Sequence, residues 1–93
     1  MNTRSLCSPR SGKPLANQWV ITTQNGEMFK SYKTMIAIRS WDGQVMLDHD
    51  WDYSATTLKY LKIFLEGLHH VSLSKSEIQK RIDDGIFQIG NLN

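Results

Sequence analysis

The sequence predicts an α+β domain: a four-stranded antiparallel meander packed by one amphipathic helix, then a short C-terminal helix and strand. Three observations predict this class. Runs rich in β-branched and aromatic residues, separated by turn residues, fill positions 18–48. Leucines recur at helical spacing between Leu58 and Leu68. A Ser-x-x-Glu capping box then begins a shorter helix at Ser74.

The composition is that of an ordinary soluble globular chain, large enough for one modest core. The 93 residues are 40% hydrophobic and 22% charged, and 11 basic against 9 acidic side chains give a formal charge of +2. This balance is far from that of a dedicated nucleic-acid binder. Cys7 is the only cysteine, which excludes an intramolecular disulfide. No apolar run approaches a membrane span, so we expect a cytoplasmic protein. A chain of this composition is expected to fold without a cofactor.

Residues 1–17 are predicted to form a flexible basic N-terminal arm, and residues 18–93 the single α+β domain. The arm carries Arg4, Arg10 and Lys13 with no acidic residue, two prolines and hardly any apolar periodicity. A solvated or loosely docked terminus is the simpler interpretation. Contact with phosphate groups is the functional alternative.

Four β-type runs predict the meander. They cover residues 18–24, 27–32, 33–40 and 44–48. Asn25-Gly26 separates the first two and favours a type I′ hairpin turn. Asp42-Gly43 stands where a second tight turn is needed.

Trp19 and the methionines of these strands are expected in the core. Trp19 is interpreted as a core residue rather than a site residue. The methionines are spread across the strands, which is typical of gap filling in a core. They are Met28, Met35 and Met46.

The helix boundaries follow from local capping chemistry. Ser54 is a favourable N-cap for the first helix and Gly67 a favourable residue beyond its end. Gly85 ends the second helix, and residues 86–89 then form a β-type run that pairs with a sheet edge or caps the core. His69 and His70 lie between the helices and are interpreted as surface residues, because no zinc-like ligand spacing accompanies them.

An acidic, aromatic loop before the first helix is the main candidate site. Asp48, Asp50 and Asp52 alternate as at the start of a calcium loop. Position six of such a loop should be Gly and is Tyr53, and position twelve should be Glu and is Lys59. We therefore assign no metal to the loop.

Two interpretations of these aspartates remain. In one, they cap the following helix and favour its positive end. In the other, Asp48, Asp50 and Asp52 join Trp41 and Trp51 in an acidic aromatic surface that occupies a basic groove on a partner.

Other functions require other residues. A nucleic-acid-binding regulator would use basic side chains, namely Arg10, Lys13, Lys33 and Arg39. A metal-dependent nuclease would need acids that converge from separate elements. No Ser-His-Asp or Cys-His set is marked by a local motif, so we expect a protein that is not an enzyme.

The string Trp-Asp-Tyr-Ser-x-Thr-Thr-x-Lys-Tyr at residues 51–60 is distinctive. With further matches along nearly the whole chain, including residues 29–32 and 43–48, it resembles a family of small, largely uncharacterised phage-encoded proteins. The resemblance implies a phage or prophage origin and action in the bacterial cytoplasm, and it supplies no catalytic residues. We expect a stoichiometric inhibitor of a host protein or ribonucleoprotein complex, of the anti-CRISPR or anti-restriction type.

Overall fold

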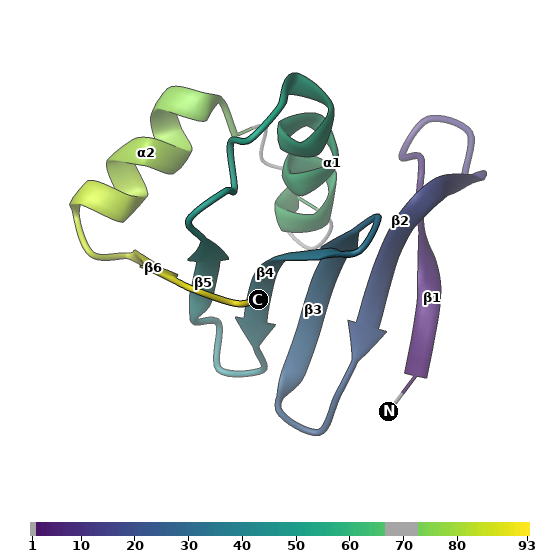
Figure 1. Cartoon of the computed structure of the whole chain (residues 1–93), viewed down its shortest axis with the longest axis horizontal. Coiled ribbons are helices and arrows are strands. Elements are labelled where there is room, and N and C mark those ends of the chain that lie inside the picture. Colours follow the sequence, from purple (N-terminus) through teal and green to yellow (C-terminus); the bar gives the residue numbers. More distant parts are fainter. Residues whose placement is uncertain (1, 67–72) are drawn as a thin grey trace.

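The computed structural model describes residues 2–66 and 73–93, and this part of the chain forms six strands and two helices (Figure 1). In chain order they are β1 (Asn2–Cys7), β2 (Pro14–Thr22), β3 (Gly26–Ser31), β4 (Thr34–Ser40), β5 (Val45–Asp48), α1 (Ala55–Glu66), α2 (Lys75–Asp83) and β6 (Phe87–Gly90). The predicted α+β class is confirmed.

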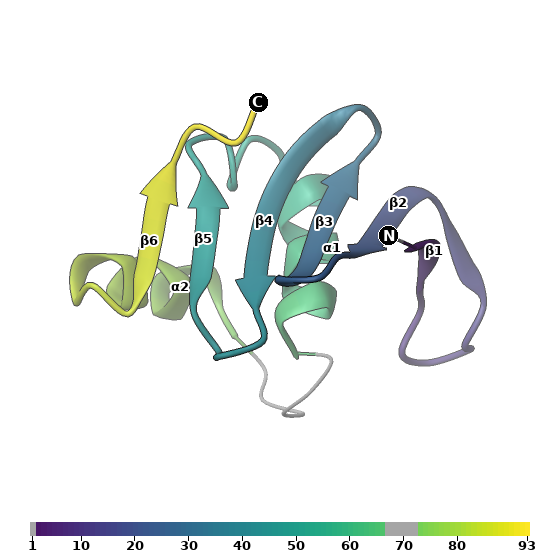
Figure 2. The same ribbon diagram turned by 90° about the horizontal axis from the view of Figure 1, so that it is seen from below.

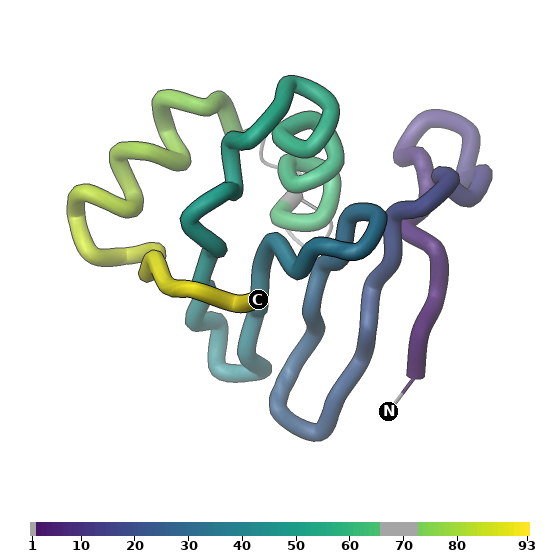
Figure 3. Tube along the Cα trace, in the orientation of Figure 1, coloured from purple at the N-terminus to yellow at the C-terminus, as the bar shows by residue number. Residues whose placement is uncertain are grey.

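The strands form one mostly antiparallel sheet in the order β1-β2-β3-β4-β5-β6. Only the last pair, β5 and β6, is parallel. Both helices belong to the connection between these two strands, and the chain can be followed through it in Figure 3. Figure 2 shows α1 and α2 on the same face of the sheet. β1 is the strand that was not predicted, whereas β6 falls on the β-type run predicted at residues 86–89 and pairs with the edge of the sheet.

The N-terminal segment is not the flexible arm that the sequence suggested. Residues 2–7 form β1, which pairs antiparallel with β2 through partners such as Arg4 and Val20. The following loop is closed by backbone hydrogen bonds from Ser8 N to Lys13 O and from Gly12 N to Ser8 O. Pairing with β1 satisfies the backbone edge that β2 would otherwise expose, which explains the difference.

The hairpin between β2 and β3 is present, but its turn is not type I′. Asn25 does not adopt the positive φ angle that such a turn requires. Instead, Thr23 Oγ1 accepts hydrogen bonds from the amides of Asn25 and Gly26, each at 3.2 Å. Gly26 is needed for another reason, since a Cβ there would lie 2.1 Å from the carbonyl oxygen of Arg39 in β4.

The core lies between the sheet and the helices. One register row runs across the middle of the sheet, from Val20 through Phe29 and Ala37 to Leu47, and all four side chains are buried. The helices cover this row with buried side chains. They are Leu61, Phe64 and Leu65 of α1 and Ile78 of α2. The ring of Phe64 stacks on that of Phe29 at a centroid distance of 5.6 Å.

The opposite face of the sheet, here called the open face, carries the methionines that were expected in the core. Alternation along a strand directs neighbouring side chains to opposite faces. The row adjacent to the core row therefore points away from the helices, and it joins Ile21, Met28, Ile38 and Met46. Trp19 and Met35 lie on the same face, paired through Lys30. All six of these apolar side chains are at least partly accessible, which corrects the assignment of Trp19 and the three methionines to the core.

The predicted helix caps are confirmed where the structure describes them. Ser54 Oγ accepts the amide three residues on at 3.0 Å, and Ser74 Oγ does the same at 3.2 Å. Gly85, at φ 76°, ends α2, with its amide bonded to the Ile82 carbonyl. The predictions for Gly67, His69 and His70 lie outside the described residues. Neither described helix has the length and apolar character needed to cross a membrane.

Candidate functional site

Asp48 lies at the end of β5 and is an interior residue rather than part of a binding surface. Its side chain is only 3% exposed. One carboxylate oxygen accepts the amide of Asp50 at 3.0 Å, and the other accepts the amide of Leu92 at 2.8 Å. Burial alone would raise the pKa of Asp48, but these two hydrogen bonds stabilise its charged form and hold the pKa below its ordinary value. Asp48 therefore fastens the C-terminal segment to the start of the loop.

Trp51 is also interior. It is 4% exposed and belongs to the hydrophobic core, and its amide donates to the carbonyl of Asp48 at 3.0 Å. The loop turns tightly after β5 and directs this indole inward. In the folded chain the indole is therefore not at the surface where the sequence interpretation placed a partner.

Trp41 is 60% exposed, but the structure does not bring it to the acidic loop. It lies in the turn between β4 and β5, at the other end of β5 from Asp48. Its indole Nε1 donates to the carbonyl of Gln24 at 3.0 Å, and its amide donates to Asn25 O at 3.1 Å. Trp41 thus links the β4–β5 turn to the β2–β3 turn.

Two of the predicted acids remain on the surface. Asp50 and Asp52 are exposed, and Asp52 Oδ2 lies 3.7 Å from Lys75 Nζ at the start of α2. This exposed ion pair is of the kind that contributes little to stability. Asp50 is the acid that borders a cleft.

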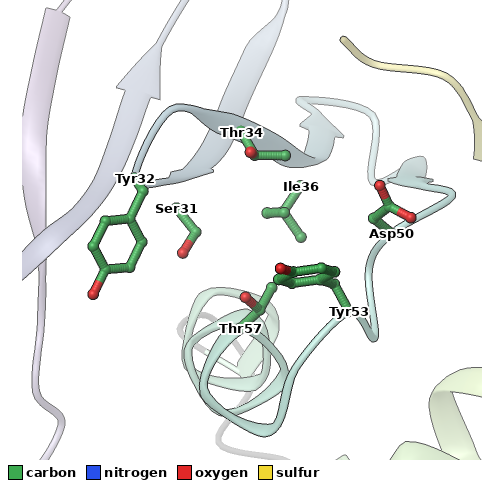
Figure 4. Close-up of a pocket in the computed structure, with 7 residues that line it drawn as sticks. All are labelled: Ser31, Tyr32, Thr34, Ile36, Asp50, Tyr53 and Thr57. Carbon is green, nitrogen blue, oxygen red and sulfur yellow. The ribbon is translucent and has the colours of Figure 1, made fainter.

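We call this hollow the tyrosine cleft, and its volume is about 440 Å³. It lies between the β3–β4 turn, the loop after β5 and the start of α1 (Figure 4). Its lining residues are Ser31, Tyr32, Thr34, Ile36, Asp50, Tyr53 and Thr57. In Figure 4 the ring of Tyr53 lies between Ile36 and Thr57, with Tyr32 and Asp50 at opposite ends.

The backbone presents both tyrosines to solvent. Tyr32 adopts a positive φ of 55° in the turn after β3, and its amide donates to Asn17 O at 2.7 Å. The amide of Tyr53 donates to the carbonyl of Asp50 at 3.0 Å, which forms the last turn before α1. Both phenol rings remain exposed.

The chemistry of the tyrosine cleft favours a cationic or hydrogen-bonding guest. Asp50 supplies the one charged group of the lining, and hydroxyl groups supply most of the remaining polarity. Aromatic faces beside a carboxylate attract guanidinium and ammonium groups. Tyr32 and Tyr53 were not among the predicted site residues. Only the position of Tyr53 within the distinctive 51–60 string hinted at it.

Arg39, one of the four basic candidates, is occupied inside the fold. Its side chain is 14% exposed and pairs with Glu27 at 3.1 Å. It also donates to the carbonyl of Phe64 at 2.9 Å and stacks over that ring at 4.5 Å. Burial alone would raise the pKa of Glu27, but hydrogen bonds and charge from Arg39 and Arg4 lower it below its ordinary value. Arg39 joins the sheet to α1 and is not available to phosphates.

The other three basic candidates are exposed at one end of the sheet. Arg10 and Lys13 lie in the loop between β1 and β2, and Lys33 lies in the turn between β3 and β4. Across residues 2–66 and 73–93, no three or more His, Cys, Asp or Glu side chains gather as a ligand set for a metal ion.

The fold and the cleft define a small α+β protein with an exposed polar and aromatic hollow. The profile of a family of unknown function (DUF8033) matches residues 1–81, and the chain belongs to this family. Neither the curated proteins nor the solved structures contain a match to it.

Proposed function

We propose that the protein is a phage-encoded binding protein that inhibits a bacterial defence or nucleic-acid-processing complex, of the anti-CRISPR or anti-restriction type. It acts in the host cytoplasm by stoichiometric binding and not by catalysis. The observation that carries this proposal is the tyrosine cleft, whose lining Asp50 shares with Tyr32 and Tyr53. Such complexes expose basic grooves to nucleic acid, and an acidic aromatic surface complements them.

The cleft refines which residues would make this contact. Asp48 and Trp51 are buried, so they support the loop from the interior. Asp50 would pair with an Arg or Lys side chain of the partner, while Tyr32 and Tyr53 would cover its alkyl stem. Tyrosine is well suited to this role, because it offers a large contact area at a small cost in side-chain entropy.

A plating experiment tests the proposal directly. Bacteria that carry a defined CRISPR or restriction system would express the protein and be challenged with a phage which that system restricts. We expect wild-type protein to restore plating against at least one system. The double variant Asp50→Asn, Tyr53→Ala should restore it at least about tenfold less, since lost interface contacts of about 1.4 kcal/mol reduce affinity by this factor.

Two controls separate binding from folding. Asp84→Asn makes the same carboxyl-to-amide change at an exposed position outside the cleft, and it should retain full protection. Circular dichroism and urea unfolding of the double variant should match wild type. Unchanged protection by a folded double variant would overturn the role of the cleft. Failure to protect against, or co-purify with, any defence complex would overturn the proposed function.

A further inference from the structure

A second hollow, here called the basic groove, lies between α1 and the loop that joins β1 to β2. Its volume is about 610 Å³, within the range of ligand-binding sites. Its residues come from two segments far apart in the sequence, and Figure 1 shows the loop standing beside α1. The lining includes Arg10 and Leu15 from the first segment and Leu58, Lys59, Lys62 and Ile63 from α1.

The floor of the basic groove is apolar. Leu15, Leu58, Tyr60 and Ile63 pack against the core with one side and remain partly accessible on the other. Leu58 was predicted to face the core, and it does so only in part. A floor of this kind suits aliphatic or aromatic side chains.

The rim of the basic groove is cationic. Arg10 approaches from the β1–β2 loop, while Lys59 and Lys62 lie one turn apart on α1. The lining contains no acidic side chain, so none of these charges is neutralised from within the groove. The polarity is therefore opposite to that of the tyrosine cleft, where Asp50 is the charged group.

We infer that the basic groove binds an acidic amphipathic segment of a partner protein. Apolar side chains of the segment would cover Leu15, Leu58 and Ile63, and its carboxylates would pair with Arg10, Lys59 and Lys62. An apolar floor favours a peptide over nucleic acid, whose backbone would place phosphates and sugars against leucine and isoleucine. This inference is independent of the tyrosine cleft and of the proposed function.

Titration with designed peptides tests the inference. The test ligand is a labelled 14-residue peptide with Leu and Phe at helical spacing and Glu on the other face. The first comparison peptide replaces every Glu by Gln, and the second replaces Leu and Phe by Ser. We expect measurable binding of the acidic peptide only, with amide shift changes in nuclear magnetic resonance spectra centred on Leu15, Leu58 and Ile63.

Matched charge reversals locate the site. Lys59→Glu with Lys62→Glu should weaken binding at least about tenfold, because two exposed charge pairs become repulsive contacts. Lys33→Glu with Lys80→Glu changes the net charge equally outside the groove and should leave the affinity within about twofold, a small screened effect.

Several outcomes would overturn the inference. They are absence of binding by the acidic peptide, equal losses in the two double variants, and shift changes centred elsewhere. Tighter binding of a 20-nucleotide DNA with a steep salt dependence would also overturn it, because it would assign the groove to nucleic acid. A result of either sign leaves the plating experiment on the tyrosine cleft unaffected.

Discussion

Asp48→Asn should destabilise the protein strongly at neutral pH. The carboxylate is 3% exposed and accepts two backbone amides, that of Leu92, 44 residues further on, at 2.8 Å and that of Asp50, two residues further on, at 3.0 Å. Asparagine keeps one acceptor oxygen but loses the charge and presents an NH₂ group to the other amide. Hydrogen bonds to charged groups contribute about 1.5–3 kcal/mol each, so we expect the free energy of unfolding to fall by about 2–3 kcal/mol. In a domain of this size, that lowers Tm by about 10 °C or more.

The effect should depend on pH with a definite sign. The pKa of Asp48 is lower in the folded protein than in the unfolded chain, so the folded state binds this proton less tightly. Its stabilisation is fully present above the ordinary aspartate pKa of about 3.9 and is lost as pH falls through the lowered pKa. Glu27 has a lowered pKa as well, but it is present in both proteins and cancels from the difference.

Urea unfolding followed by tryptophan fluorescence, from pH 7 stepwise into acid, measures both effects. The stability difference between wild type and Asp48→Asn should be largest at pH 7 and shrink below pH 4. Asp84→Asn serves as the control and should stay within about 0.5 kcal/mol of wild type, as exposed substitutions do. Equal urea midpoints at pH 7, or a difference that stays constant in acid, would refute the structural role of Asp48.

Five further substitutions test other parts of the fold by urea unfolding. Gly26→Ala should cost about 1–3 kcal/mol because its Cβ would lie 2.1 Å from a backbone oxygen, whereas Gly90→Ala meets a flexible methionine side chain at 3.1 Å and should cost less. Arg39→Met should cost about 2–3 kcal/mol, since it removes the Arg39 donor from the Phe64 carbonyl and leaves the Glu27 carboxylate paired with Arg4 alone; wild-type stability would contradict this. Trp51→Ala should cost about 3–5 kcal/mol as a core truncation. Trp41→Ala should cost about 1 kcal/mol, the value of one exposed hydrogen bond. A larger loss of stability for Trp41→Ala than for Trp51→Ala would be inconsistent with the burial of the two side chains.

The features that the sequence predicted well are set by short-range chemistry. Ser54 and Ser74 cap helices through amides three residues away, and Gly85 ends a helix through its own backbone freedom. The α+β class follows from the same kind of local pattern, in which the hydrophobic period changes from two to about 3.6. Each of these features depends on residues that lie within a few positions of one another, so a short stretch of sequence is enough to predict it.

The errors concern interactions between distant segments. Asp48 looks like a surface acid until its partner Leu92, 44 residues further on, is placed beside it. Trp51 carries no local mark that separates a core indole from an exposed one. The tyrosine cleft is formed by Tyr32 and Tyr53 from separate elements, and no spacing rule joins them.

The strand faces show a second limit. Period-two alternation separates Phe29 from its neighbour Met28, but it does not say which of the two faces the helices will cover. Both faces of these strands are apolar enough to serve as a core. Only the placement of α1 and α2 decides that Phe29 is inside and that the methionines are on the open face.

The methionines of the open face are accessible to oxidants. Oxidation converts a methionine thioether to a polar sulfoxide, and exposure favours the reaction. Met28, Met35 and Met46 lie on the open face, and none of the buried core side chains in residues 2–66 and 73–93 is a methionine. Sulfoxide formation would therefore make the open face more polar, while the aromatic and aliphatic core keeps its packing. Oxidation would therefore change the tendency of the protein to associate through the open face and would leave its melting temperature unchanged.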